Sequence, residues 1–360
     1  MASKPKPGAV GVCLICRDFS GPDNHAAQFP RTSLPSSDAG WLATQLTAPF
    51  SSLTDKARAI FVWLHHNVDY DTHSFFNGTI SKSTPERTIT SGLAVCEGYA
   101  SLFATLALKA GLECVVVGGH GKGFGHSSLK PGDPLPPFSC SHAWNAVRID
   151  HGEWKLIDAC WGAGALMSPG NKYNRHLTEA EFTKSNDDFG LTHFPEDKAH
   201  FFRSDGRAMT WQEYMLDDMG ERLQLYSESE HGIGARTFQP AQKHIKVNDP
   251  NEPVMRVQFA AACPHWDNEK HGKGKPYLLT LSLGGRDGRN SHQIPFNTDG
   301  RVWWLDVNRF DLGAPGQNIN VCAVTDFDGR DARGLTMAQW KAKQGRVAQR
   351  WVPVCMWELV

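Results

Sequence analysis

The hydrophobic pattern of this 360-residue chain changes near residue 250, and the change constrains its fold. Before that point, apolar residues recur at helical spacing over long segments, with a few strand-like runs between them. After about Pro253, short alternating runs are separated by turns rich in glycine and aspartate. This second pattern is typical of an all-β module and favours a β-sandwich. The length also suits two domains better than one core.

The first part of the chain predicts two main helices. The clearer one covers residues 95–110, whose apolar side chains fall on one face and which Gly111 ends. The other covers residues 55–67, with Thr54 or Asp55 as its cap. Both patterns indicate helices that bury one face against a neighbouring element.

Strands are expected directly after the helix predicted for residues 95–110. Residues 112–118 are typical of a buried strand, and a loop rich in glycine and proline is predicted for residues 119–139. Residues 142–149 and 153–158 then predict a hairpin, since Asp150-His151-Gly152 between them is a strong turn signal. We therefore expect an α+β fold with a helix packed on an antiparallel sheet, followed by the β-sandwich.

The predicted domain organisation has three parts. Residues 1–50 form a lead-in that packs on the core, and its first forty residues, rich in proline, serine, glycine and aspartate, are expected to be extended. Residues 51–245 form the catalytic domain, and residues 250–360 form the β-sandwich module.

Cys96 stands where a glycine-containing segment enters the clearest predicted helix. The helix dipole and the unpaired amides of the first turn favour a thiolate at such a position. The same amides can hold an oxyanion. The alternative is a structural cysteine, because unpaired cysteines are among the most buried residues.

His142 and Asp158 flank the predicted hairpin. With a three-residue loop, Asp158 lies opposite Trp144, and His142 lies opposite Cys160. The two polar side chains then share one face, about 7–8 Å apart on the diagonal, which side chains can span. A nucleophile needs such a base, oriented by a carboxylate. The alternative is two unrelated polar residues beside a turn.

Three short motifs around these residues resemble those of the transglutaminase-like superfamily and occur in its order. They are Gly-Leu-Ala-Val-Cys-Glu-Gly-Tyr-Ala (92–100), Ser-His-Ala-Trp-Asn (141–145) and Lys-Leu-Ile-Asp-Ala-Cys-Trp-Gly (155–162). Val-Asp-Tyr-Asp (68–71) is similar to an element that precedes the family's nucleophile. The stretch His-Phe-Pro-Glu-Asp (193–197) is similar to one in the branch that contains kyphoscoliosis peptidase and the fungal cytokinesis protein 3.

The resemblance implies a papain-like core and a Cys96-His142-Asp158 triad that acts through a thioester on peptide or glutamine-type amides. Hydrolysis and acyl transfer both remain open, since they use the same triad. The resemblance also implies an alternative, a catalytically idle scaffold in septum- or cytoskeleton-associated interactions of a fungal protein. Crosslinking members carry a tryptophan shortly before the nucleophilic cysteine. This chain has no tryptophan at that place. Tyr70 is therefore one candidate for a second oxyanion donor, and a packed core tyrosine is the alternative.

Several residues near the triad are expected to line the substrate cleft. Trp144 and Trp161 are candidates for its walls, although core packing explains them as well. His120 and His126 are candidates from the glycine-rich segment 118–125, which fails the phosphate-loop pattern and is better explained as a mobile loop.

Composition limits the other functions. A net charge of −1 and a pI near 7.0 do not favour nucleic-acid binding, and the absence of a long apolar run argues against membrane insertion. Nine scattered cysteines without a secretory leader indicate reduced thiols and a cytoplasmic protein. Cys13 and Cys16 have only Cys263 and His265, far along the chain, as further zinc ligands, so we expect no metal and no cofactor. The expected partner is a protein or peptide substrate; the oligomeric state is left open.

Overall fold

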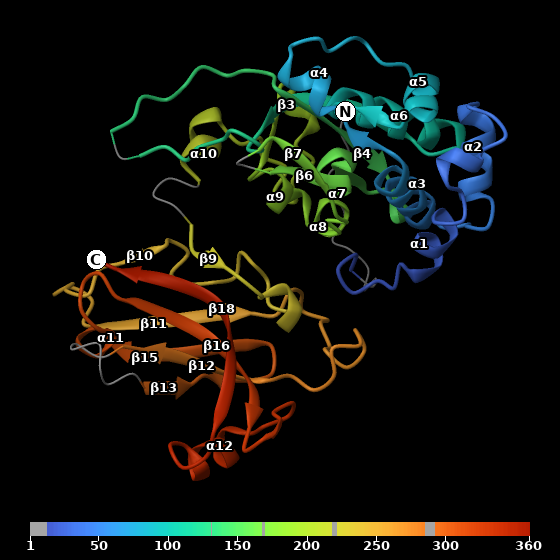
Figure 1. Cartoon of the computed structure of the whole chain (residues 1–360). Helices are drawn as coiled ribbons and strands as arrows, with labels where there is room; N and C mark the ends of the chain where they lie inside the picture. Colours follow the sequence, from blue (N-terminus) through green and yellow to red (C-terminus); the bar gives the residue numbers. More distant parts are fainter. Residues whose placement is uncertain (1–12, 131, 168–169, 218–221, 285–291) are drawn as a thin grey trace. The chain divides into compact units, whose positions relative to one another are not determined.

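A computed structural model describes residues 13–130, 132–167, 170–217, 222–284 and 292–360 (Figure 1). The chain divides into two compact units. The first comprises the residues up to Ser127 together with Asp133–Asp217, and the second comprises Ser128–Gly132 together with Asp218–Val360. Helices cover a sheet in the first unit and strands dominate the second, which confirms the predicted α+β class.

The helices of the first unit are short, apart from α3 and α6. Their bounds are α1 (Ser20–Ala26), α2 (Ala39–Thr47), α3 (Leu53–Asn67), α4 (Thr72–Phe76), α5 (Pro85–Ser91), α6 (Cys96–Lys109), α7 (Ala159–Ala163), α8 (Ala180–Thr183), α9 (Asn186–Phe189) and α10 (Trp211–Leu216). Both long helices were predicted. Among the described residues, no helix combines the length and the apolar character that a membrane crossing requires.

The predicted cap of α3 was wrong. Ser52 caps this helix, because its hydroxyl accepts a hydrogen bond from the Asp55 N–H at 3.1 Å. The helix therefore begins at Leu53, before the predicted start at residue 55. A serine with extended backbone satisfies one of the unpaired N–H groups of the first turn, which is the usual task of an N-cap.

The prediction of an extended lead-in was also wrong, because α1 and α2 begin within its first forty residues. For α1, which contains Asp23, the reason is a buried cation in α3. The Arg58 guanidinium donates two hydrogen bonds of 2.7 Å to the Asp23 carboxylate and lies 4.7 Å from the centre of the Phe19 ring. A buried guanidinium needs such a partner, and a local pattern cannot reveal it. Residues 1–12 of the lead-in lie outside the described residues.

A four-stranded antiparallel sheet lies at the centre of the first unit. Its order is β5 (Trp154–Ile157), β4 (His142–Arg148), β3 (Cys114–Gly121) and β8 (His193–Pro195). Asn145 pairs with Ile157 and Arg148 with Trp154, so the three-residue hairpin loop and its register are confirmed.

Strand β3 continues through Gly121, which corrects the prediction of a loop from residue 119. Glycine is used here because aromatic rings press on the backbone. A Cβ atom at Gly119 would lie 2.5 Å from the Trp144 ring, and one at Gly121 would lie 3.0 Å from both His142 and Trp161. The glycines therefore allow close packing within a regular strand, which a composition-based loop prediction misses.

Helix α6 packs on this sheet with its apolar face. Leu102, Phe103 and Leu106 are fully buried in the core that the sheet also lines. The buried side chain of Asn145 in β4 donates a hydrogen bond from Nδ2 to the Ala100 carbonyl of α6 at 2.9 Å. The helix with the nucleophile candidate is thus tied directly to the strand that carries His142.

Two small strand pairs complete the first unit. They are β1 (Asp69–Tyr70) with β2 (Leu93–Ala94), which are parallel, and β6 (Gly164–Met167) with β7 (Lys172–Arg175), which are antiparallel. In the first pair Tyr70 stands level with Ala94, two residues before Cys96. The pair therefore fixes the chain directly before the start of α6.

The second unit contains two sheets that share one core. A seven-stranded sheet has the order β10-β18-β16-β12-β13, with β9 beside β18 and β17 beside β16, and a three-stranded sheet has the order β11-β15-β14. The bounds are β9 (Gln224–Leu225), β10 (His244–Ile245), β11 (Val254–Ala260), β12 (Leu278–Leu283), β13 (His292–Pro295), β14 (Asn297–Thr298), β15 (Val302–Asn308), α11 (Arg309–Leu312), β16 (Asn318–Phe327), β17 (Arg330–Asp331), α12 (Met337–Lys343) and β18 (Gln349–Leu359). Buried side chains of both sheets, such as Phe259 and Val321, meet in this core, which confirms the sandwich.

Gly162 provides a test of the packing between α7 and α3. A Cβ atom at this position would lie 2.2 Å from the ring of Phe61. Gly162→Ala should therefore destabilise the protein by about 1–3 kcal/mol, the usual cost of overpacking. Gly21→Ala, where nothing lies within 4 Å, is the control, and it should stabilise α1 by roughly 0.5–1 kcal/mol. Urea unfolding measures both, and a Gly162→Ala protein as stable as the wild type would contradict the close contact.

Candidate active site

Cys96 is the first residue of α6, one position after the predicted start of this helix at residue 95. The preceding residue, Val95, has an extended backbone and makes no side-chain capping bond. The N–H groups of Cys96 and Glu97 lie in the first turn, where a helix offers them no internal acceptor. The partly exposed thiol therefore stands beside free amide donors and the positive end of the helix dipole, which suits a developing anion.

His142 connects this thiol to Asp158. The His142 Nε2–H donates to the Asp158 carboxylate, Oδ2, at 2.6 Å. The Cys96 thiol lies near the same imidazole and contributes to the raised pKa of His142, and because Nε2 faces Asp158, Nδ1 is the nitrogen left for the thiol. The structure thus brings together the three residues that were proposed as a triad from the sequence.

Asp158 is buried and accepts hydrogen bonds on both carboxylate oxygens. Oδ1 accepts the N–H groups of Cys160 at 2.8 Å and Trp161 at 3.0 Å, so Asp158 is the N-cap of α7. Oδ2 accepts from the imidazoles of His142 and His193. A carboxylate held in this way has its orientation fixed by the fold.

The charges of this site support an ion pair. Burial disfavours a charged imidazole at His142, but the Asp158 carboxylate and the Cys96 thiol outweigh it and raise the pKa of His142 to about 10. Burial also opposes ionisation of Asp158, yet His142 and His193 hold the pKa of this carboxyl well below its usual range. At neutral pH the pair is therefore imidazolium and carboxylate.

His193 is a member of this cluster that the sequence analysis did not propose as a site residue. Its Nε2–H donates to Asp158 Oδ2 at 3.0 Å, and the Thr192 hydroxyl donates to its Nδ1 at 2.9 Å. Its ring stacks on Phe189, with centroids 3.9 Å apart. Burial lowers the pKa of His193 to about 3, so the ring is neutral and can supply a donor to Asp158 without adding a charge.

The only sequence signal for His193 was its place in the stretch 193–197, which entered through the resemblance. The residue lies 35 positions after Asp158, at the start of β8, and reaches the site because β8 pairs with β3. Neither spacing nor periodicity indicates a contact of this kind.

Trp161 and Trp144 both lie near His142 but differ in exposure. Trp161 is partly exposed and stacks on the His142 ring, with centroids 4.8 Å apart. Trp144 is buried and packs edge-on against His193 and near Phe189. The structure thus gives Trp161 a surface toward solvent, whereas Trp144 supports the site from within.

Tyr70, His120 and His126 also lie near the site. Tyr70 is partly buried, and burial, together with the charges of Cys160 and Cys96, raises its pKa above the usual value. His120 Nδ1 lies 3.1 Å from the Tyr214 hydroxyl, and its ring centroid is 6.3 Å from that of His126. Burial lowers the pKa of His120, and the positive charges of His126, Lys122 and His142 lower it further.

Two groups of side chains contain residue types that can bind a metal ion. The ligand atoms of His142, Asp158 and His193 lie within 4.8 Å of one another. Both imidazole Nε2 atoms, however, point at the same carboxylate oxygen at hydrogen-bonding distance, which leaves their lone pairs unavailable to an ion. The sulfurs of Cys13 and Cys16 lie 3.2 Å apart, and this pair would supply two of the four ligands that a structural zinc site requires. The expected absence of a metal stays a prediction.

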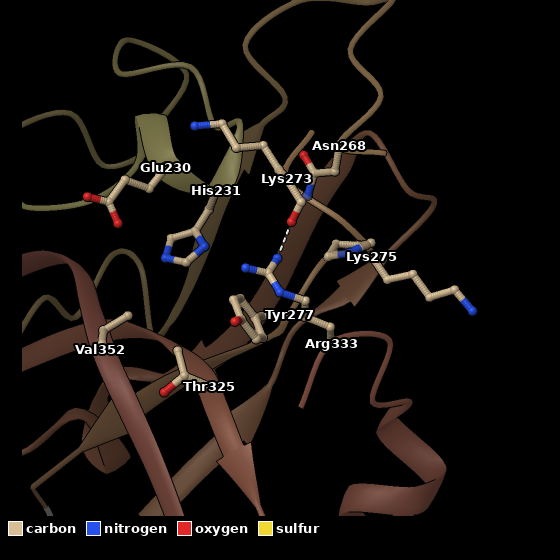
Figure 2. Close-up of a pocket in the computed structure, with 10 residues that line it drawn as sticks. Glu230, His231, Asn268, Lys273, Lys275, Tyr277, Thr325, Arg333 and Val352 are labelled. Atoms are coloured by element: carbon tan, nitrogen blue, oxygen red, sulfur yellow. Dashed lines mark hydrogen bonds between the residues drawn. The ribbon is translucent and has the colours of Figure 1, made fainter. Parts of the chain in front are cut away.

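The second unit has a cavity of about 400 Å³, shown in Figure 2. Lys273, Lys275 and Arg333 give it a cationic lining, and the Arg333 guanidinium lies 4.6 Å from the centre of the Tyr277 ring. The residues that line it include no cysteine.

The region around this site is similar to known proteins. Residues 41–159, which include all three residues of the proposed triad, match the family model of the transglutaminase-like superfamily. Kyphoscoliosis peptidase of Homo sapiens is 30% identical over 205 residues, covering 51% of this chain and 30% of the relative. Hillarin of Drosophila melanogaster is 28% identical over 231 residues, covering 64% of this chain and 24% of the relative. The similarity thus spans less than a third of either relative's length.

A solved structure described as a TGase is similar at 19% identity, with a TM-score of 0.27. The similarity covers 46% of this chain and 37% of that chain.

The neutral, buried state of His193 predicts a pH dependence of stability. In the unfolded chain this histidine binds a proton below about pH 6.5, whereas in the folded chain it does so only near pH 3. Because the unfolded state then binds more protons, stability falls as the pH falls through this range, by up to about 1.4 kcal/mol per pH unit. His193→Gln, which keeps an amide donor for Asp158 but cannot titrate, should show a shallower fall in urea unfolding between pH 7 and pH 4.5.

Two variants complete this experiment. His176→Gln changes an exposed histidine and should keep the wild-type slope. His193→Phe keeps the ring shape but removes the donor, and should cost about 1.5–3 kcal/mol at pH 7, as expected for a lost hydrogen bond to a charged group. Equal slopes in the wild type and His193→Gln would contradict the neutral buried imidazole.

Proposed function

Residues 41–159 of this chain form a transglutaminase-like domain, and on this basis we propose that the protein is a thiol-dependent enzyme. It acts on peptide or glutamine-type amides through Cys96, His142 and Asp158. The substrate is a protein or a peptide, and the covalent intermediate is a thioester on Cys96.

One observation carries this proposal. The imidazole of His142 has one nitrogen on the Asp158 carboxylate and the other toward the Cys96 thiol. A scaffold without chemistry has no need of a buried charged pair directed at a partly exposed thiol, because buried charges are costly unless they are well paired. The arrangement is the one that a nucleophile, a base and an orienting group require.

In the first step, the Cys96 thiolate attacks the carbonyl carbon of the amide. The negative charge that develops on the carbonyl oxygen is held by N–H groups of the first turn of α6. His142, as the imidazolium, then donates its Nδ1 proton to the leaving nitrogen, and the C–N bond breaks. The products of this step are a thioester and free ammonia or an amine.

In the second step, His142 acts as the base. It removes a proton from water or from a primary amine, which attacks the thioester carbonyl and releases the Cys96 thiolate. Water gives hydrolysis and an amine gives acyl transfer. Asp158 keeps the ring in one orientation in both steps, with His193 and the α7 amides holding the carboxylate in place.

The state of the cysteines suggests where such an enzyme works. Six cysteines of the described chain take part in no disulfide: Cys96, Cys114, Cys140, Cys160, Cys322 and Cys355. A catalytic thiol accompanied by reduced thiols suits a reducing compartment, so we propose the cytoplasm.

The identity of the acyl acceptor can be measured directly. The protein is incubated with a glutamine-containing peptide and a labelled primary amine, and the products are weighed by mass spectrometry. We expect loss of ammonia with gain of either water or the amine. Cys96→Ala should abolish both products, and Asp158→Asn should slow their formation by several orders of magnitude, as in other triads. Equal product from the wild type and Cys96→Ala, or none from either, would favour the scaffold.

The pairing of Cys96 with His142 predicts the pH profile of thiol alkylation. Since the pKa of His142 is raised to about 10, its positive charge persists across neutral and mildly acidic pH and favours a thiolate beside it. Alkylation of Cys96 by iodoacetamide should therefore remain fast at pH 6, where an ordinary thiol loses about tenfold in rate for each pH unit below its pKa. In His142→Gln the fast alkylation of Cys96 at pH 6 should disappear. Cys140, which is exposed and lies two residues before His142, provides an internal reference.

A further inference from the structure

Three phenylalanines of the first unit are exposed and contact one another. Phe75, Phe76 and Phe124 are 37%, 39% and 45% exposed. The ring centroids of Phe75 and Phe76 are 5.1 Å apart, and those of Phe76 and Phe124 are 5.8 Å apart. Isolated exposed apolar residues are common on protein surfaces, but a contiguous aromatic cluster indicates a binding site. We call these three residues the aromatic rim.

The fold positions this rim beside the nucleophile. The parallel pairing of β1 with β2 holds Tyr70 level with Ala94, and the N–H of Asp71 donates to the Ala94 carbonyl at 2.9 Å. Asp71 then caps α4, which carries Phe75 and Phe76. Helix α4 lies beside the end of β3 in Figure 1, and Phe124 follows that strand. The rim is therefore built from one segment that precedes α6 in the chain and one that follows it.

Continuous contacts run from the rim to the catalytic residues in two directions. On one side the Tyr70 ring is 5.5 Å from Phe75, and the charge of Cys96 acts on its hydroxyl. On the other side, Gly123, next to Phe124, lies so close to Trp161 that a Cβ atom there would be 2.6 Å from the indole ring. Trp161 in turn stacks on His142. The rim is thus joined to His142 by packing through Trp161, and through Tyr70 it lies near Cys96.

We propose that the aromatic rim is a substrate subsite, which binds an apolar and preferably aromatic side chain next to the residue whose carbonyl Cys96 attacks. This rests on the proposed function. The rim is continuous with the residues around the thiol. The group that binds to the rim therefore belongs to the same substrate molecule that reaches Cys96. The three phenylalanine side chains offer no hydrogen-bonding group, so they favour an apolar neighbour over a charged one, which would lose hydration without compensation.

Covalent labelling tests the subsite without requiring turnover. Two peptides of equal length carry a halomethyl ketone in place of a glutamine side-chain amide, one with phenylalanine on both sides of this residue and one with serine on both sides. For each peptide, the rate at which it modifies Cys96 is divided by the rate at which the same peptide reacts with free cysteine. We expect the phenylalanine reagent to be favoured by at least about tenfold in the wild type, as for a hydrophobic pocket.

Paired variants connect this preference to the rim. Phe76→Ser combined with Phe124→Ser should reduce the preference to near one and leave the rate with iodoacetamide unchanged. Phe76→Leu combined with Phe124→Leu should keep most of it. Phe310→Ser, which removes a phenylalanine that is 61% exposed in the second unit, is the control and should keep all of it.

The outcomes separate the two proposals. A wild-type preference near one, or a preference that survives the double serine variant, overturns the subsite. So does a double serine variant that also loses its reaction with iodoacetamide, because the rim then supports the thiol itself. If the preference follows the rim while no amide is ever converted, the subsite stands and the proposed enzymatic function fails.

Discussion

The Asp158 carboxylate is the constraint on which the rest of the site depends. It is fully buried, and a buried charge is tolerated only when its oxygens are satisfied. Here four N–H groups do so: two from the first turn of α7 and two from the imidazoles of His142 and His193. Three elements, α7, β4 and β8, are thereby held around one carboxylate. The orientation of His142, and with it the direction of its second nitrogen toward Cys96, follows from this arrangement.

Glycines near the site leave room for the aromatic rings that surround the buried Asp158 carboxylate. Gly119, Gly121 and Gly123 alternate along β3 and the segment after it, and the rings of Trp144, His142 and Trp161 occupy the space that side chains would take. The rings can therefore pack closely against the strand, and they surround the buried charges with an apolar environment. Low local polarity strengthens each hydrogen bond to the carboxylate, and it also makes an unpaired donor or acceptor costly.

Much of this site could be predicted from the sequence because its determinants are local. The start of α6 places Cys96 through helix periodicity, and a three-residue turn sets the register that brings His142 and Asp158 to one face. Elements whose determinants are distant could not be predicted. The contact of Asp23 with Arg58 holds α1 within a segment that was expected to be extended, and ring packing accompanies the strand β3 where a loop was expected.

By itself, then, the sequence determined the order of the motifs, the two long helices, the hairpin register and the change to a β module, since each follows from patterns within a few residues. Only the tertiary structure decided that His193 completes the hydrogen bonds of Asp158 and that Phe124 joins Phe76 at the edge of the site. Both contacts join segments far apart in the chain. They form only when β8 pairs with β3 and α4 settles beside the end of that strand, and no local pattern encodes such pairings.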